Sequence, residues 1–268
     1  MARALFDWRR TPGLGPYAWV VLGFLYAPLV VLVVYAFNAN EIATVWTGFS
    51  LNWFGKALHN SDIQRATVNT LVVAVAATLI STAIAVTGAI ALERGPAKLR
   101  ERGFATGLIM MPLVVPEIVV AITTLVFFSA IGLQLGLGNL IIAHTVFCIP
   151  FALLPIQARL RDIGSAVEDA ARDLYADEWR VFRRVTLPLL MPAVVSGALL
   201  AFVVSLDDFL ISFMVSQAGT TTLPVYIYGM MRVGLTPEIN AISTLLLLVS
   251  LALVIPAMLT RGRSSGHR

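Results

Sequence analysis

Three acidic residues lie within stretches of the sequence that are otherwise apolar. Glu117 follows Pro116 inside a long hydrophobic run, and Asp207 and Asp208 are adjacent near the end of another. A charged side chain costs at least about 2.5–3.5 kcal/mol at the centre of a membrane, so intramembrane charges usually mark a functional path. The outer halves of the apolar runs hold no basic residue that could neutralise these acids. The three carboxylates are therefore candidates for binding a cationic solute in a wet cavity.

Aromatic side chains near these acids would suit a cation that also carries a methylene chain. Phe209 and either Tyr226 or Tyr228 are the candidates. Because neighbouring residues on a helix point about 100° apart, Asp207 and Asp208 cannot both face one pathway unless the helix end unwinds. The small and polar residues on the same helical stripe as Asp208 are Gly197, Ala201, Ser205 and Ser212. This stripe favours Asp208 for the interior, and both acids remain candidates.

His144 and Cys148 are four residues apart and share one helix face, which raises the question of a metal site. No third or fourth ligand is near them in the sequence, so we expect polar packing and no metal. The single cysteine also excludes a disulfide framework and a four-thiolate metal centre.

The composition excludes a soluble globular enzyme. Of the 268 residues, 58% are hydrophobic and only 13% are charged, too few charges to cover a water-facing surface. A bilayer core about 30 Å thick needs about 20 apolar residues in a helix. Six stretches meet this need: 17–37, 67–92, 104–131, 140–157, 189–206 and 241–259. The sequence therefore predicts an all-α integral membrane protein with six transmembrane helices in a single domain, 1–268.

The positions of lysine and arginine predict the orientation. With the N-terminus inside, segments 1–16, 93–103, 158–188 and 260–268 hold 16 of the 19 basic residues. Both termini are then cytoplasmic, an N-in/C-in arrangement in the plasma (inner) membrane. The net charge of +4 is explained by this placement, so we expect contact with membrane lipid and no nucleic-acid partner.

The inside loop 159–188 is polar in an otherwise apolar chain. Ser165 and Glu168 have capping-box spacing, which predicts that a short helix begins there. Asp177 could cap a second short helix, and Pro188 would then open the fifth span. Two amphipathic helices at this face are typical of a docking element, and a loop helix lying on the membrane surface is the alternative.

This loop resembles the motif of ABC importer permeases, which reads Glu-Ala-Ala, three residues, Gly, nine residues, Ile, any residue, Leu-Pro. Asp169 stands where the motif has glutamate, and Tyr175 stands where it has glycine. If that joint has a left-handed backbone, a residue with a side chain costs about 1–2 kcal/mol there. The residues expected to couple the chain to an ATPase are Glu168, Asp169, Ala170, Ala171, Tyr175, Leu187 and Pro188.

Four further stretches, 112–118, 144–151, 205–209 and 231–241, resemble the second permease subunit of spermidine/putrescine importers. The resemblance implies the type I permease fold of ABC importers, with cytoplasmic coupling helices. It also implies three partners: an ATP-binding subunit homodimer, a second homologous permease and an external solute-binding protein. No cofactor is expected in this chain, because ATP and Mg²⁺ would bind to the ATPase.

Two alternatives to a polyamine permease remain. The same importer class could carry an amino-acid-derived or opine-like solute, in which case the acids would serve gating or structure. A membrane-embedded enzyme is the remote alternative, since the chain has no His-Glu-x-x-His motif and no nucleophile with a nearby base. It also lacks the phosphate-binding loop G-x-x-x-x-G-K-[ST], so ATP hydrolysis must come from another subunit.

Overall fold

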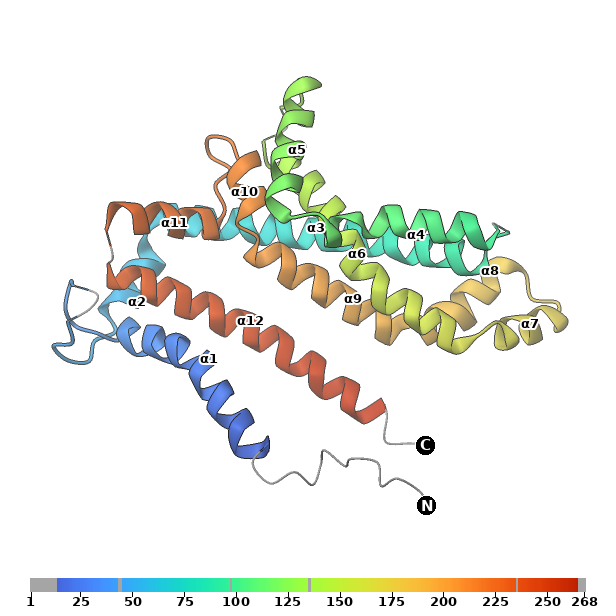
Figure 1. Ribbon diagram of the computed structural model, residues 1–268, viewed down its shortest axis with the longest axis horizontal. Helices are drawn as coiled ribbons and strands as arrows, with labels where there is room; N and C mark the ends of the chain where they lie inside the picture. The colour runs from blue at the N-terminus through green and yellow to red at the C-terminus, as the bar shows by residue number, and fades with distance from the viewer. Residues whose placement is uncertain (1–13, 43–44, 97, 135, 235, 265–268) are drawn as a thin grey trace, which may run out of the picture. The chain divides into compact units, whose positions relative to one another are not determined.

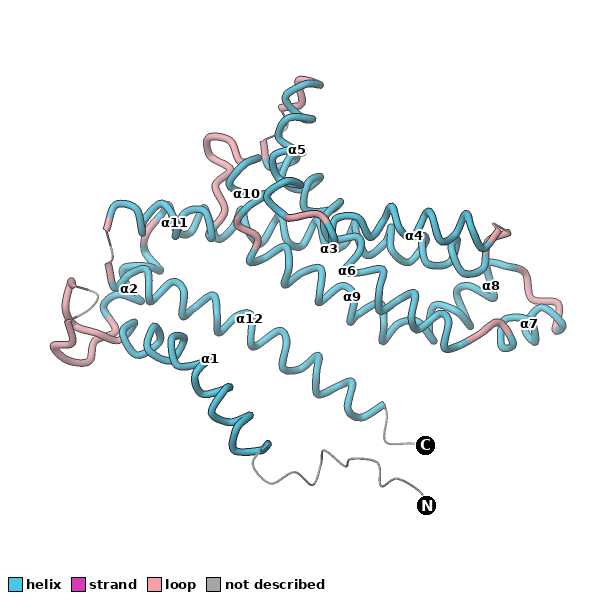
Figure 2. The backbone as a smooth tube through the Cα atoms, in the orientation of Figure 1, coloured by secondary structure: helices cyan, strands magenta, loops and turns pink. Residues whose placement is uncertain are grey.

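The computed structural model describes residues 14–42, 45–96, 98–134, 136–234 and 236–264. These residues form helices joined by loops (Figure 2). Among them, Asn38 and Phe49 form an isolated antiparallel bridge. The chain divides into two compact units, Met1–His59 with Met230–Leu247 and Asn60–Gly229 with Leu248–Arg268. The basic residues of 1–13, on which part of the expected orientation rests, lie outside the described residues.

The first unit contains α1 (Leu14–Ala36), α2 (Asn52–His59) and the beginning of α12 (Pro237–Ser264). Its loop between α1 and α2 is organised by the buried Asn38. The Asn38 amide donates to the carbonyl of Val45 at 2.7 Å, and its oxygen accepts from the N–H of Thr47 at 3.1 Å. The indole N–H of Trp53 donates to the backbone carbonyl of Asn38 at 2.9 Å. Buried polar groups are thus paired within the loop.

The second unit is built on three long helices, α3 (Ser61–Arg94), α6 (Leu137–Ile163) and α9 (Leu187–Asp207). They pack against one another side by side (Figure 1). Asn60 begins α3 by accepting from the N–H groups of Asp62 and Ile63. This unit also contains the shorter helices α4 (Leu99–Val114), α5 (Glu117–Ala130), α7 (Ala166–Asp173), α8 (Glu178–Val181) and α10 (Leu210–Val215), a π-helical turn (Phe182–Thr186), most of α11 (Leu223–Val233) and the part of α12 from Leu248.

Small residues allow the three long helices to approach closely, as is typical of helices in membranes. A core cluster joins them, formed by Ala85, Ala89, Cys148, Ala152, Leu153, Ile156, Leu160, Leu190 and Ala201. At Gly197 on α9, an added Cβ would lie 2.6 Å from the carbonyl oxygen of Ala152 on α6. The contact between α6 and α9 therefore depends on a residue without a side chain.

Two breaks interrupt the helical spans of the second unit. The expected span 104–131 is bent by 104° between α4 and α5. The sequence predicts a kink at Pro116, and the structure has a full break there because a proline cannot donate to the ladder and restricts the residue before it. The second break separates α9 from α10 at Asp208 and Phe209.

The long helices agree with most of the expected spans. Four described helices are long and apolar enough to cross a membrane, and the bent pair α4 and α5 adds a fifth if it counts as one span. In α12, the apolar helix over Pro237–Ala252 is shorter. The all-helical membrane architecture is confirmed, and the count of six spans stays a prediction.

The helix α9 begins at Leu187 with Pro188 in its first turn, as the sequence suggested, but it follows α8 without a gap. The helix is continuous over Glu178–Asp207 and includes a π-helical turn, Phe182–Thr186, just before that proline. A proline ring disturbs the regular hydrogen-bond ladder of the preceding turn, and a π-helical turn accommodates this. The second short helix of the loop, α8 (Glu178–Val181), is thus continuous with the long helix α9.

Candidate functional site

The break between α9 and α10 separates the environments of the two adjacent acids. Asp207 is the last residue of α9 and is exposed, whereas Asp208 is non-helical and buried. One carboxylate oxygen of Asp208 accepts from the N–H of Ser212 at 2.8 Å. The buried stripe of small and polar residues predicted for Asp208 is confirmed on α9 and α10. The structure therefore directs Asp208, and not Asp207, into the interior of the second unit.

His144 on α6 bridges the two sides of this break. One ring nitrogen lies 2.8 Å from the Ser205 hydroxyl on α9, and the other lies 3.0 Å from the Ser212 hydroxyl on α10. Its Nε2 atom is also 3.4 Å from a carboxylate oxygen of Asp208. The expected polar packing of His144 is confirmed. Its contact with Asp208 was missed, because residues about sixty positions apart carry no local signal of their proximity.

Glu117 is brought to the same place by the other break. It is the first residue of α5, half-buried, and α5 packs against α10. Its carboxyl group lies within electrostatic range of that of Asp208, whose Oδ2 atom is buried and has no hydrogen-bond partner among the described residues. Two carboxyl groups held together in a low-dielectric site favour a proton or a cation between them. The helix breaks thus bring together two of the three acids that the sequence singled out.

An aromatic cluster includes Phe209, the residue that follows Asp208 at the helix break. The ring of Phe209 is 4.8 Å from that of Tyr228 and 5.3 Å from that of Phe213, measured between centroids. Of the two tyrosines proposed from the sequence, the structure places Tyr228 against Phe209. Tyr226 lies elsewhere, and its role on a substrate path stays a prediction.

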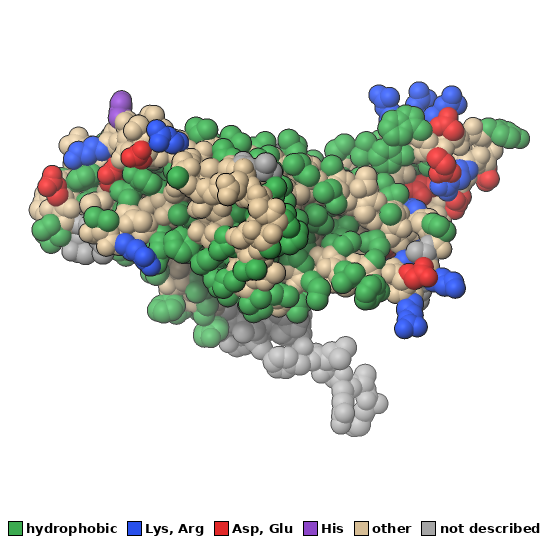
Figure 3. All heavy atoms as spheres, turned by 90° about the horizontal axis from the view of Figure 1, so that it is seen from above, with side chains coloured by type: hydrophobic (Ala, Val, Ile, Leu, Met, Phe, Trp, Pro, Cys, Tyr) green, Lys and Arg blue, Asp and Glu red, His purple; other side chains and the backbone are tan. Residues whose placement is uncertain are grey.

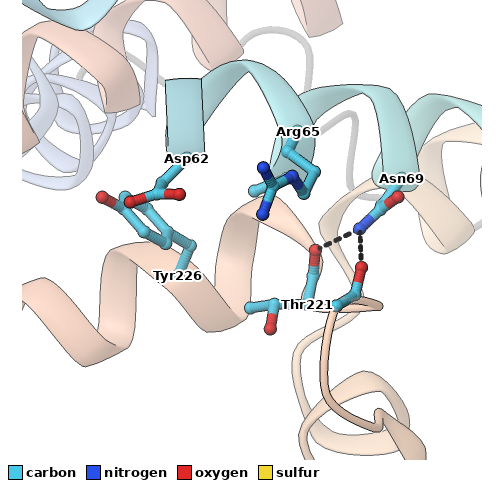
Figure 4. A pocket seen from close by; sticks show the side chains of 7 residues that line it. Asp62, Arg65, Asn69, Thr221 and Tyr226 are labelled. Carbon is cyan, nitrogen blue, oxygen red and sulfur yellow. Dashed lines mark hydrogen bonds between the residues drawn. The ribbon is translucent and has the colours of Figure 1, made fainter. Parts of the chain in front are cut away.

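Tyr226 lines a small pocket of about 180 Å³ at the beginning of α3. Its ring lies beside Asp62, and Arg65 and Asn69 follow along the same helix (Figure 4). The Asn69 amide donates to the carbonyls of Gly219 and Thr221 at 3.1 and 3.0 Å. These bonds hold the loop between α10 and α11 against α3.

The expected coupling loop contains two short helices, as the motif implies. Asp177 caps α8 by accepting from the N–H of Arg180, which confirms the sequence prediction. The predicted capping box at Ser165 is wrong, because the Ser165 side chain makes no capping bond. The side chain of Glu168 is directed instead to Arg94 and Thr186. The ion pair with the half-buried Arg94 and the bond from Thr186 satisfy both carboxylate oxygens of Glu168, whereas a capping bond would satisfy one.

Tyr175 joins α7 to α8 with a left-handed backbone, φ 61°. Among the residues that the structure describes, no other non-glycine residue has a positive φ. The N–H of Ala176 donates to the carbonyl of Ala171 at 3.1 Å, and that of Tyr175 to Arg172 at 2.9 Å, which closes the end of α7. The conformation that normally requires glycine is therefore present with a tyrosine.

The outer surface of the loop combines apolar and charged side chains. Val167, Leu174, Tyr175 and Trp179 are exposed. Arg172 pairs with Glu178 and with Asp169, each at 2.8 Å, and the pairing with Glu178 is the larger cause that raises the pKa of the guanidinium. Charged side chains gather at the end of the second unit that carries α7 and α8 (Figure 3).

The other residues assigned to coupling are divided between the exposed and the packed parts of this loop. Ala170 is exposed and Ala171 is half-buried on α7. Leu187 and Pro188 begin α9, where Leu187 is half-buried and Pro188 is exposed.

A family model described as "Binding-protein-dependent transport system inner membrane component" matches residues 98–264. The chain belongs to this family. The match covers both helix breaks and the whole loop with α7 and α8, so the resemblance of the loop to permeases of this class is confirmed. Members of the family are transport components of the inner membrane and not enzymes.

Similar proteins point to one group within the family. The chain is 35% identical over 254 residues to the spermidine/putrescine transport system permease protein PotC of Escherichia coli, covering 94% of this chain and 96% of that protein. It is 36% identical over 249 residues to PotC of Haemophilus influenzae, covering 93% and 96%. It is 38% identical over 230 residues to the putrescine transport system permease protein PotI of Escherichia coli, covering 84% and 82%.

Solved structures show the same fold. A bacterial ABC transporter involved in the import of alginate superposes with a TM-score of 0.67 at 18% identity, covering 97% of this chain and 99% of that one. The MetNI methionine ABC transporter superposes with a TM-score of 0.60 at 18% identity, covering 74% and 95%. The fold is that of ABC importer permeases.

Proposed function

We propose that this chain is the permease subunit that moves polyamines through a binding-protein-dependent ABC importer, with Asp208 and Glu117 receiving the ammonium groups of the cargo. The observation that supports the cargo is the meeting of two carboxyl groups at two helix breaks, in a chain whose relatives are named as spermidine/putrescine permeases. With the competing amino-acid-derived or opine-like cargo, the acids would serve gating or structure instead.

The geometry fits a diamine or triamine in three ways. A primary ammonium between Asp208 and Glu117 would relieve the repulsion of the two carboxylates. The exposed Asp207 adds a third negative charge at the end of α9. The rings of Phe209 and Tyr228 provide an aromatic surface for the methylene chain and for a second ammonium group.

Membership of the family supports a proposal for the arrangement of the whole subunit. We place six spans in the inner membrane with both termini in the cytoplasm. The loop with α7 and α8 then faces the ATP-binding homodimer, which holds ATP and Mg²⁺. A second, homologous permease completes the pathway, and an external solute-binding protein delivers the cargo to the opposite face.

Uptake of labelled putrescine and spermidine by cells with and without this gene tests the proposal. We expect uptake to be lost on deletion and restored by the intact chain. In a strain with no other polyamine importer, unchanged uptake after deletion would contradict the polyamine cargo. Binding of an amino acid or opine, and not a polyamine, by the cognate external protein would favour the alternative cargo.

Neutralising the two adjacent acids separately tests their assigned roles. We expect Asp208→Asn to reduce uptake about tenfold or more, because a charge-assisted contact contributes about 1.5–3 kcal/mol. The matched control Asp207→Asn should reduce uptake less than about threefold, since an exposed charge is screened by water. Initial rates at saturating binding protein measure both effects. Equal losses in the two variants would argue against a special role for Asp208.

A further inference from the structure

The chain buries one charged residue of its coupling loop. Glu168 is 2% exposed, whereas its neighbour Asp169 is exposed on the same helix, α7. Removing a carboxylate from water is unfavourable unless cationic and hydrogen-bonding partners compensate it. The position of Glu168 is therefore determined by the groups that surround it.

Those partners come from the helices of the membrane core. The guanidinium Nε of Arg94, at the end of α3, donates to one carboxylate oxygen of Glu168 at 2.8 Å. The hydroxyl of Thr186, immediately before α9, donates to the other oxygen at 2.9 Å. Both oxygens of Glu168 are thus held, each by a different element.

Arg94 extends the connection to a further helix. Its Nη2 atom donates to the carbonyl of Leu160 at 3.1 Å and to that of Gly164 at 2.5 Å. These carbonyls lie at the end of α6, where the last turn of a helix lacks internal partners. The guanidinium at the end of α3 therefore joins this helix to α6 and α7, and through Glu168 it also reaches the residue that precedes α9.

We propose that Arg94 is a positioning residue which makes α7 move together with the ends of α3, α6 and α9. We call Arg94, Glu168 and Thr186 the latch. The inference rests on the proposed function, in which an ATPase displaces the coupling loop. A buried and geometrically fixed contact transmits such a displacement, whereas flexible surface side chains would absorb it. Without the latch, ATP would be hydrolysed with little movement of the pathway.

A second ion pair at the same helix ends provides a matched control. Arg161 on α6 lies 2.7 Å from Glu93 on α3, and Gln157 also donates to Glu93 at 2.7 Å. This pair joins α3 to α6 as the latch does, but it includes no residue of α7. Arg161→Met thus removes a salt bridge between the same core helices and leaves the latch in place.

The experiment uses the complete transporter in proteoliposomes, with its ATPase, second permease and loaded binding protein. ATP hydrolysed per spermidine imported is measured for wild type, Arg94→Met and Arg161→Met. We expect this ratio to rise at least tenfold in Arg94→Met and to stay within twofold in Arg161→Met. A ratio that is unchanged in Arg94→Met, or raised equally in both variants, would overturn the latch.

A double variant separates coupling from folding. Arg94→Met with Glu168→Met replaces the pair by apolar side chains of similar size, an exchange that buried pairs often tolerate. We expect the ATPase to co-purify with it normally, while the ratio remains as high as in Arg94→Met. Restored coupling in the double variant would show that only the unpaired charge mattered, and would overturn the proposal.

Failure of the proposed function gives a different result. A wild-type complex that imports no polyamine would contradict the proposal that the cargo is a polyamine. The latch proposal could still be tested in that case. The measurement would compare how strongly the loaded binding protein stimulates ATP hydrolysis in Arg94→Met and in Arg161→Met.

Discussion

At the residue scale, Tyr175 shows how a departure from the family motif can be tolerated at a joint. Its positive φ is the conformation in which a Cβ atom meets the following carbonyl. Its side chain is 95% exposed, so burial of the ring within this chain does not compensate the strain. The two backbone hydrogen bonds that close α7 hold the conformation in place.

Replacing this tyrosine by glycine tests the strain. We expect Tyr175→Gly to stabilise the joint by about 1 kcal/mol. Glycine relieves about 1–2 kcal/mol of backbone strain, and its greater freedom in the unfolded chain offsets part of that gain. Hydrogen exchange of the Ala176 amide, which donates to Ala171, should slow about fivefold. Tyr175→Ala is the control, since it removes the ring and keeps the strain. Equal protection in both variants would contradict the argument.

At the element scale, the second unit is defined by how its helices are interrupted as much as by how they pack. The apolar stretches were predictable from their length, and the break at Pro116 from the properties of proline. The break at Asp208 was not, because no proline or glycine marks it. Asp208 instead accepts from the N–H of Ser212 in the first turn of α10, which begins at Leu210. Glu168 was placed in a capping box by its spacing, and a tertiary partner 74 residues away displaced that local bond.

The bridge by His144 predicts a specific loss when it is removed. In His144→Leu, the hydroxyls of Ser205 and Ser212 lose their buried partner, which costs about 1–3 kcal/mol. We expect a lower thermal midpoint of the detergent-solubilised complex and a large loss of uptake, because Asp208 is no longer held across the break. Cys148→Ala, one turn further along the same buried face of α6, should retain most uptake.

The approach of α6 to α9 gives a second prediction at this scale. Gly197→Ala places a Cβ against the backbone of Ala152, so the helices must separate, at a cost of about 1–3 kcal/mol. Gly88→Ala on α3 is the matched control, since nothing in this chain lies within 4 Å of the added atom. The thermal midpoint of the isolated chain should fall for the first variant and stay equal or rise for the second. A similar fall in both would contradict close packing at Gly197.

At the scale of the whole molecule, composition was sufficient for the membrane class and the loop motif for the family. The pairing of Asp208 with Glu117 required the tertiary structure, because two helix breaks in different spans bring the residues together. The sequence identified each acid as unusual, and the stripe of small and polar residues already favoured Asp208 over Asp207 for the interior, as the structure has it. Non-local contacts of this kind have no periodicity that a sequence pattern could reveal.

The orientation of the chain is a whole-molecule property that single cysteines can measure. The native Cys148 is buried, so Cys148→Ser gives a background without a reactive thiol. Asp173→Cys lies at the end of α7 and Asp62→Cys in the first turn of α3, and both positions are exposed. If basic loops stay inside, an impermeant thiol reagent should label Asp62→Cys in spheroplasts and Asp173→Cys only in inverted vesicles. The reverse pattern would place the docking loop on the wrong side for a cytoplasmic ATPase, and labelling of both positions from one side would contradict an odd number of crossings between them.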